Sequence, residues 1–251
     1  MNFSFNIITN YTDQPQTLNR IQKTIKSIEK NYIDGLSWEV IVIGGQGDLG
    51  IKSDKISIKR AFFDETQKEK PWITKKKNVG ASLSLYENMV VMHDYYEFDD
   101  NWYTNLLKHK EDFLSADIIS CPIKTNENKP FYLDWITWDL PNYGSHRNLL
   151  YRDWSRTKHQ YVSGGFFIVK KEFFKKHPLD ESRLWGDMED VEWSLRVRNF
   201  AKIICLPESI VRMTKVHRDN KVEYRSIVGL YSKEELLGNQ IIRKQYTNEN
   251  L

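Results

Sequence analysis

The chain has 251 residues, of which 40% are hydrophobic and 28% charged, a composition typical of a folded domain and not of a disordered chain. Its net charge of +3 comes from 37 basic and 34 acidic residues, a balance that argues against nucleic-acid binding. The start, MNFSFNIITN, lacks the basic region of a signal peptide, and no apolar run approaches the ~18 residues of a membrane span. We therefore expect a cytoplasmic protein that makes at most peripheral contact with a membrane.

The first part of the chain predicts a parallel βαβ unit. Residues 3–9 form a strand-like apolar run, and residues 38–43 (WEVIVI) suit a strand that is buried on both faces. Between them, apolar residues from Leu18 to Ile28 recur at intervals of three and four, which indicates an amphipathic helix over 17–31. Strand, helix and strand in this order favour a parallel sheet.

The middle of the chain continues this alternation. We expect, in order, a strand over 56–63, a loop over 64–72, a helix over 74–86, a strand over 89–92, a helix over 99–110 and a strand over 117–122. In the helix over 74–86, Val79, Leu83 and Tyr86 fall along one side, and the small residues over 80–82 fall on another. Residues 93–97 would form a loop at the carboxyl edge of the sheet.

The lysines and cysteines indicate the surroundings of their segments. The run of Lys75, Lys76 and Lys77, and the four lysines between 170 and 176, suit either a solvated surface or contact with phosphates or a membrane. The residues alone leave both interpretations open. Cys121 and Cys205 each follow an apolar pair, so we expect buried free thiols and no disulfide.

Residues 124–160 break the regular pattern with a mixture of polar and aromatic side chains, among them Trp135. An irregular segment of this length in a compact domain is usually functional. Its aromatic rings would suit either stacking against sugar rings or closing the core beneath a long loop, and both alternatives stay open.

The stretch over 161–198 concentrates unusual residue types. Gly164 and Gly165 precede an apolar strand over 166–169, Trp185 follows, and four acids open a helix, at positions 187, 189, 190 and 192. Glu189 and Asp190 point to different faces of the helix start, so one can enter a cleft while the other pairs with a cation. A carboxylate close to an acceptor hydroxyl can remove its proton, and repulsion among the acids should raise at least one pKa. Helix capping is the alternative role. A strand over 201–206 and a helical tail over 231–251 complete the chain.

Polar residues follow several of the predicted strands, at the edge where open α/β sheets bind ligands. Residues 9–11 follow the first strand, Gly44 the second, and His93 and Asp94 the strand over 89–92. Asp94 suits a hard cation such as Mg²⁺ or Mn²⁺, which would offset the charge of a diphosphate, although helix capping is an alternative. His93, and His217 after the last strand, are either metal ligands or structural residues.

Taken together, these segments resemble a family 2-type glycosyltransferase of the GT-A fold. FNIITNYTD followed by WEVIVIGG resembles the first βαβ unit of that family, and ITKKKNVGASLSLYENMVVMHDYYEFDDNWY resembles its block with N-x-G, DxD and W. VSGGFFIVKKEFF and WGDMEDVEWSLR resemble its Gly-Gly and "ED" acceptor blocks. The chain departs from the family at His93-Asp94-Tyr95, where two acids are usual, and at Gly44-Gly45, where an acidic loop is usual.

The resemblance implies a single α/β domain, GT-A-like and Rossmann-like, with a mostly parallel central sheet flanked by helices. Residues 1–122 would form the donor-binding half, 123–220 the acceptor-binding and catalytic half, with an irregular insertion, and 221–251 a helical tail. The implied reaction moves a sugar from a nucleotide-diphosphate sugar to a hydroxyl of a glycan or lipid-linked sugar, by one inverting displacement, in glycan or polysaccharide synthesis. The alternatives are a non-catalytic carbohydrate-binding relative and a sugar nucleotidyltransferase, although the latter would need a glycine- and arginine-rich loop after the first strand.

The resemblance also implies roles for individual residues. The catalytic base would be Asp190, with Glu189 as its neighbour. The donor site would comprise Thr9, Asn10, Tyr11, Gly44, Lys77, Asn78, His93 and Asp94. The acceptor site would comprise Trp135, Gly164, Gly165 and Trp185. Mn²⁺ or Mg²⁺ would be held by Asp94 and His217.

Overall fold

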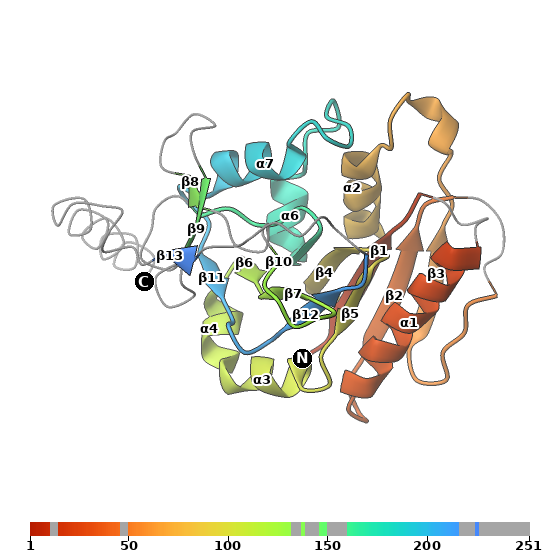
Figure 1. Ribbon diagram of the computed structural model, residues 1–251. Helices are drawn as coiled ribbons and strands as arrows, with labels where there is room; N and C mark the ends of the chain where they lie inside the picture. The colour runs from red at the N-terminus through yellow and green to blue at the C-terminus, as the bar shows by residue number, and fades with distance from the viewer. Residues whose placement is uncertain are drawn as a thin grey trace, which may run out of the picture.

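The computed structural model describes residues 1–10, 15–45, 50–131 and 160–215, together with the backbone of short strands at 137–138, 146–149 and 224–225 (Figure 1). Among the predicted site residues, Tyr11, Trp135 and His217 lie outside the described residues, as does the tail over 231–251.

A seven-stranded sheet forms the centre of the fold, with strand order β11-β6-β10-β4-β1-β2-β3. Its strands are β1 (Phe3–Ile8), β2 (Trp38–Ile43), β3 (Ser57–Ala61), β4 (Asn88–His93), β6 (Ile118–Ser120), β10 (Phe166–Lys170) and β11 (Ile203–Cys205). Neighbouring strands are parallel except that β10 runs antiparallel to both β4 and β6. The mostly parallel sheet is therefore confirmed, and strands from both predicted halves of the chain share it.

Helices cover both faces of this sheet (Figure 1). They are α1 (Pro15–Asn31), α2 (Ile73–Leu83), α3 (Trp102–Lys108), α4 (Lys110–Ser115), α6 (Lys171–Lys176) and α7 (Glu189–Val197), with a 3₁₀ turn η1 (Glu65–Gln67). One core packs side chains of α1, α3 and α4, such as Ile25 and Trp102, against Phe3 and Phe5 of β1. A second core packs Phe174 and Trp193, with other side chains of α2, α6 and α7, against the opposite face.

A small second sheet was not predicted. It joins β5 (Tyr96–Phe98), β12 (Val211–Met213) and β7 (Ile123–Thr125), in the order β5-β12-β7. The loop expected over 93–97 is therefore confined to Asp94 and Tyr95, because His93 ends β4 and Tyr96 begins β5. Each of these strands has three residues. They are too short to show a period in the sequence, and their pairing depends on segments that are distant along the chain. A third sheet has the order β13 (Tyr224–Arg225), β9 (His146–Leu149), β8 (Thr137–Trp138).

The helix predicted over 74–86 is present as α2, but the line of Val79, Leu83 and Tyr86 is not its buried side. Leu83 is exposed, Val79 is only partly buried, and Tyr86 lies beyond the end of the helix. The buried side of α2 consists of Ile73, Thr74, Lys76, Lys77, Gly80 and Ala81. The two lysines enter the interior because each has a carboxylate partner there, which a count of apolar residues cannot detect.

The structure also bears on the predicted cysteines and on the helix predicted over 99–110. The thiols of Cys121 and Cys205 are both free, Cys121 is buried as expected, and Cys205 is partly exposed. The helix predicted over 99–110 begins at Trp102 and is interrupted at His109, after which α4 begins. In the part of the chain that the structure describes, we find no helix with the length and apolar character of a membrane span.

Candidate active site

Strands β1 and β4 end side by side and bring two predicted residues together. The main-chain N–H of Asp94 donates to the carbonyl oxygen of Ile8 over 3.2 Å, which continues the parallel register of the two strands. The Thr9 hydroxyl then donates to Oδ2 of Asp94 over 2.7 Å. Arg20 of α1 places its Nη2 atom 3.3 Å from the same carboxylate oxygen. Asp94 is therefore a buried carboxylate held by a hydroxyl and a guanidinium.

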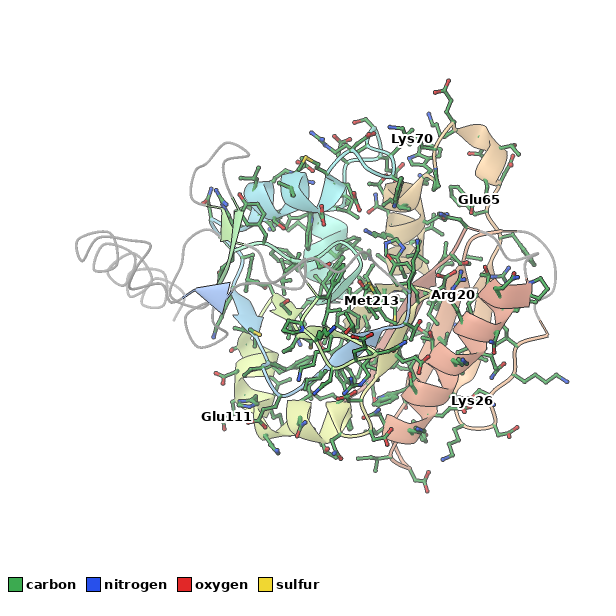
Figure 2. All side chains as sticks on the ribbon, viewed as in Figure 1. Arg20, Lys26, Glu65, Lys70, Glu111 and Met213 are labelled. Carbon is green, nitrogen blue, oxygen red and sulfur yellow. The ribbon has the colours of Figure 1, made fainter. Side chains whose placement is uncertain are left out.

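Lys76 contacts the residues that follow β1 from another direction. Its side chain has 0% exposure, and its ammonium group donates to the Thr9 carbonyl at 2.9 Å and to the two carboxylate oxygens of Glu65 at 2.9 and 3.0 Å. It also donates to the side-chain oxygen of Asn10. Figure 2 labels Glu65 on η1 and Arg20 on α1. Burial lowers the pKa of Lys76, and the hydrogen bond and charge of Glu65 oppose that shift.

Gly44, after β2, fits against the same strand end. Its φ of +129° is one that L-residues with side chains rarely adopt, and a Cβ atom there would lie 1.9 Å from the Thr9 carbonyl oxygen. Its main-chain N–H donates to the Ala61 carbonyl at 3.0 Å. Only glycine allows this close approach of the two strand ends.

His93 connects the two halves of the site. Its main-chain N–H donates to the carbonyl of Gly165 at 3.0 Å, and its ring stacks on the ring of Tyr95, with centroids 5.3 Å apart. Burial, and then the positive charges of Lys77 and other nearby lysines, lower the pKa of His93 well below its usual value. The imidazole is therefore neutral at neutral pH.

The glycine pair fits against the predicted base. Oδ2 of Asp190 accepts from the Gly164 N–H at 2.8 Å, and Oδ1 accepts from the Val191 N–H at 2.9 Å. A Cβ atom on Gly164 would lie 2.9 Å from Asp190, and one on Gly165 would lie 2.4 Å from the hydroxyl of Tyr96. Burial, followed by the negative charge of Glu189, raises the pKa of Asp190. This agrees with the prediction that one acid of the cluster has a raised pKa, although burial is the larger cause.

Glu189 and Asp190 do face different partners, as predicted from their positions at the helix start. Oε1 of Glu189 lies 3.0 Å from Nζ of Lys77, and both side chains are buried. The other two acids of the cluster have structural contacts. Asp187 accepts from the Leu184 N–H, and Glu192 pairs with Arg196 one helical turn later.

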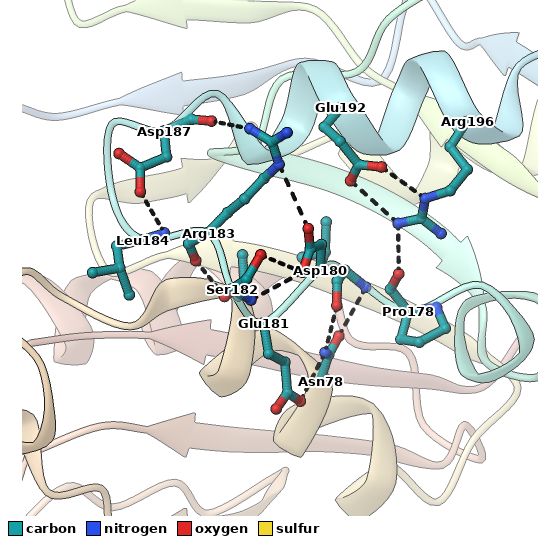
Figure 3. Close-up of polar contacts among 12 residues, drawn as sticks. Asn78, Pro178, Asp180, Glu181, Ser182, Arg183, Leu184, Asp187, Glu192 and Arg196 are labelled. Carbon is teal, nitrogen blue, oxygen red and sulfur yellow. Dashed lines mark hydrogen bonds and ion pairs between the residues drawn. The ribbon is translucent and has the colours of Figure 1, made fainter.

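The loop before α7 presents an exposed aromatic side chain. Trp185 has 58% exposure, and its main-chain N–H donates to the Pro71 carbonyl at 3.0 Å. Figure 3 shows hydrogen bonds that hold this loop, including the one from Arg183 to the Asp187 carbonyl. Asn78 also donates to the Leu179 carbonyl. The ring of Trp185 is therefore presented to solvent by a segment whose backbone is well anchored.

The predicted site residues thus fall into two joined groups. Thr9, Asn10, Gly44, His93 and Asp94 lie at the ends of β1, β2 and β4. Gly164, Gly165, Asp190 and Glu189 lie at the start of β10 and α7, joined to the first group through His93. The side chains of Lys77 and Asn78, predicted for the donor site, contact Glu189 and the segment over 179–181, on the side predicted for the acceptor.

Sequence reasoning missed three residues of the site: Arg20, Glu65 and Lys76. Arg20 lies one turn after Thr17 on α1, so its position near the end of β1 follows from helical geometry once the strand pairing is known. Glu65 lies in a segment that was predicted only as a polar loop, and nothing in its neighbourhood signals a buried lysine partner. Lys76 was treated as one member of a basic run.

The residues described do not by themselves form a metal centre. Within the described ranges, no group of three or more His, Cys, Asp or Glu side chains could hold a metal ion. Asp94 supplies one carboxylate, of which Oδ2 is bonded to Thr9 and Arg20. The second predicted ligand, His217, lies outside the described residues.

Comparisons with known proteins identify the fold. No family model matches the chain, and neither does any curated protein sequence. Among solved structures, S. aureus TarS 1-349 in complex with UDP-GlcNAc matches with a TM-score of 0.58 and 15% identity, over 87% of this chain and 60% of that one. GalNAc-T7 with UDP, GalNAc and Mn²⁺ matches with a TM-score of 0.60 and 16% identity, over 98% of this chain and 50% of that one.

A third similar structure is the mannosyltransferase PcManGT from Pyrobaculum calidifontis in complex with GDP-Man and Mn²⁺, with a TM-score of 0.55 and 12% identity, over 98% of this chain and 61% of that one. The chain therefore spans between 50% and 61% of the length of these three structures. At such low identity the likeness shows the fold alone. The chain has the GT-A fold of these glycosyltransferases, as its resemblance to the family predicts.

Proposed function

We propose that the protein transfers a sugar from a nucleotide-diphosphate sugar to a hydroxyl group of an acceptor. One observation carries the proposal: the Asp190 carboxylate is held by the Gly164 N–H, and the adjacent Gly165 is hydrogen-bonded to His93, beside Asp94. The candidate base at the start of α7 is thus linked, through the glycine pair before β10, to the end of β4 and its carboxylate Asp94. The similar structures were determined with UDP-GlcNAc, with UDP and GalNAc, or with GDP-Man, which supports a donor of this class.

In this proposal, Asp190 removes the proton of the acceptor hydroxyl as its oxygen attacks the anomeric carbon. The nucleotide diphosphate leaves from the opposite face, so one displacement inverts the configuration. The donor would lie along the ends of β1, β2 and β4, against residues 9–11, Gly44, His93 and Asp94. The acceptor would lie against the glycine pair, Trp185 and the segment that contains Trp135. It would be a glycan or a lipid-linked sugar, in polysaccharide synthesis.

A divalent cation remains a prediction within this proposal. Mn²⁺ is present with two of the similar structures. In this chain Asp94 would be a ligand, together with His217, and the ion would offset the charge of the leaving diphosphate. Asp94 is the one carboxylate at the described end of β4, and the proposal assigns the proton transfer to Asp190 and no step to the ion. Release of UDP from UDP-GlcNAc with EDTA, with Mn²⁺ and with Mg²⁺ measures the dependence.

The test of the proposed reaction is the Asp190→Asn variant. UDP release from UDP-GlcNAc and GDP release from GDP-mannose are followed, with a panel of glycan acceptors, for the wild type and the variant. We expect Asp190→Asn to lower the rate by about 10²- to 10⁴-fold, because it removes the base, while the donor still raises the melting temperature. The matched control is Glu192→Gln, which changes an acid of the same helix whose partner is the surface residue Arg196.

Two outcomes would contradict the proposal. A wild-type rate in Asp190→Asn would remove Asp190 from the mechanism. Binding without turnover of any nucleotide sugar would favour the alternative of a non-catalytic carbohydrate-binding relative, which the single carboxylate at the strand end also suits.

A further inference from the structure

Lys77 has an environment unlike that of an ordinary surface lysine. Its side chain has 1% exposure, and its ammonium group lies 3.0 Å from Oε1 of Glu189, which is itself buried. The pair connects α2 to the first residue of α7, Glu189, which directly precedes Asp190. Lys76, next to Lys77 on α2, contacts the donor edge. A buried ion pair of this kind does not by itself indicate stability, because desolvation opposes the attraction of the charges. The position of this ion pair beside the proposed base therefore indicates a role other than stabilisation.

The charges around Asp190 act in opposite directions. Burial and the negative charge of Glu189 favour the protonated carboxyl, whereas Lys77 and the N–H groups of Gly164 and Val191 favour the ionised form. Three titratable groups lie at the end of β4. Asp94 pairs with Arg20, His93 is neutral, and Tyr95 stays protonated because burial raises its pKa. Burial is the largest influence on the pKa of Asp190, and the charges of Glu189 and Lys77 act on it in opposite directions.

We propose that Lys77 is a positioning residue for the catalytic base: its ammonium group holds Glu189 away from Asp190 and offsets the charge of Glu189, so that Asp190 is ionised when the acceptor arrives. This inference rests on the proposed function, because it assigns Lys77 to the reaction of Asp190. It places a residue of the donor-side helix in control of the acceptor-side base. It also gives Glu189 a role as the link between the two.

The proposal predicts shifts of opposite sign from two substitutions in the same ion pair. Lys77→Met leaves the charge of Glu189 uncompensated beside Asp190, so the pKa of Asp190 rises, and the acidic limb of the pH–rate profile moves to higher pH. Glu189→Gln removes the repulsion but keeps Lys77, so the pKa falls and the limb moves to lower pH. Each shift should be about one pH unit. The double variant should lie between the two, near the wild type.

The titration is measured in two ways. One is the pH dependence of kcat/KM for UDP release from UDP-GlcNAc. The other needs no turnover: the ¹³C carboxyl resonance of Asp190 is followed by NMR against pH, with Asp190→Asn to assign the signal. Far-UV circular dichroism and thermal unfolding report whether each variant folds, and Lys77→Arg, which keeps the charge, should restore the wild-type titration if Lys77→Met shifts it.

Lys75→Met is the matched control, because Lys75 is a neighbour on the same helix whose partner is Glu181 and not Glu189. It should leave the Asp190 titration in place. Shifts in the same direction for Lys77→Met and Glu189→Gln, or no shift in either, would overturn the inference. Failure of the proposed function would look different: Asp190→Asn would release UDP at the wild-type rate, while the NMR titration would still show whether Lys77 controls the Asp190 carboxylate.

Discussion

The proposed donor and acceptor sides of the site, called the donor side and the acceptor side below, differ in how much of their side-chain surface is bonded or covered within the chain. On the donor side, the Lys76 ammonium group is fully buried and donates to the Thr9 carbonyl, to Asn10 and to both carboxylate oxygens of Glu65. On the acceptor side, Trp185 and Met188 have 58% and 44% exposure although the backbone around them is anchored. The donor side is thus internally bonded, whereas the acceptor side presents apolar surface without a partner among the described residues.

This difference predicts whether a substitution acts mainly on the free energy of unfolding or on ligand binding. Removing one member of a buried polar network leaves the others desolvated and unpaired, so the main effect is on the free energy of unfolding. Removing an exposed ring costs little folding energy, so the main effect is on binding. The three predictions that follow apply this distinction, beginning with the largest expected effect on stability.

Lys76→Met should destabilise the fold strongly. It leaves Glu65, whose side chain has 24% exposure, without its ammonium partner, and it also removes the donor to the Thr9 carbonyl. We expect a loss of about 3 kcal/mol in the free energy of unfolding, measured by urea denaturation. Lys75→Met is the matched control, because Lys75 and Glu181 form a pair with 39% and 36% exposure, for which we expect a loss below about 1 kcal/mol. Equal losses in the two variants would show that burial does not distinguish these neighbouring lysines.

The lysine run also shows what the sequence could and could not reveal. Residues 3–9, 17–31 and 38–43 predicted β1, α1 and β2 closely, because apolar periodicity determines which elements bury their side chains. The same reasoning predicted α2 as a helix but did not show which side is buried, because that side includes the charged residues Lys76 and Lys77. Their burial depends on Glu65 and on Glu189, which lies more than a hundred positions away in the chain. Pairings over such distances leave no local pattern.

Among the site residues, those that were found follow from simple topology. Thr9 and Asp94 end neighbouring parallel strands, so their approach is expected once the strands are identified. Gly164 and Asp190 were selected by residue type and by resemblance, and the structure adds that they touch. The contact of Asn78 with Leu179 could not be predicted, because it depends on the course of the loop before α7.

Gly164→Ala tests whether the close contact between Gly164 and the Asp190 carboxylate is needed for folding and for activity. An added Cβ atom would lie 2.9 Å from Asp190, so the carboxylate must shift away from the Gly164 N–H. We expect a loss of about 1 to 2 kcal/mol in unfolding free energy, together with a loss of UDP release that is larger than this destabilisation explains. Gly35→Ala is the control for a glycine at which a Cβ meets nothing within 4 Å, although its φ of +90° costs about 1 kcal/mol. A similar loss of activity in both variants would show that the glycine pair has no specific role in catalysis.

Trp185→Ala should have the smallest effect on folding and should act on the acceptor. Because the ring has 58% exposure, we expect the free energy of unfolding to change by no more than about 0.5 kcal/mol. UDP release without acceptor should be unchanged, whereas binding to a glycan array should weaken, since stacking on an exposed ring is lost. Phe62→Ala is the matched control, because Phe62 has 63% exposure and lies just after β3. If both variants bind the array as the wild type does, Trp185 does not contact the acceptor, and the exposed surface of this loop serves another purpose.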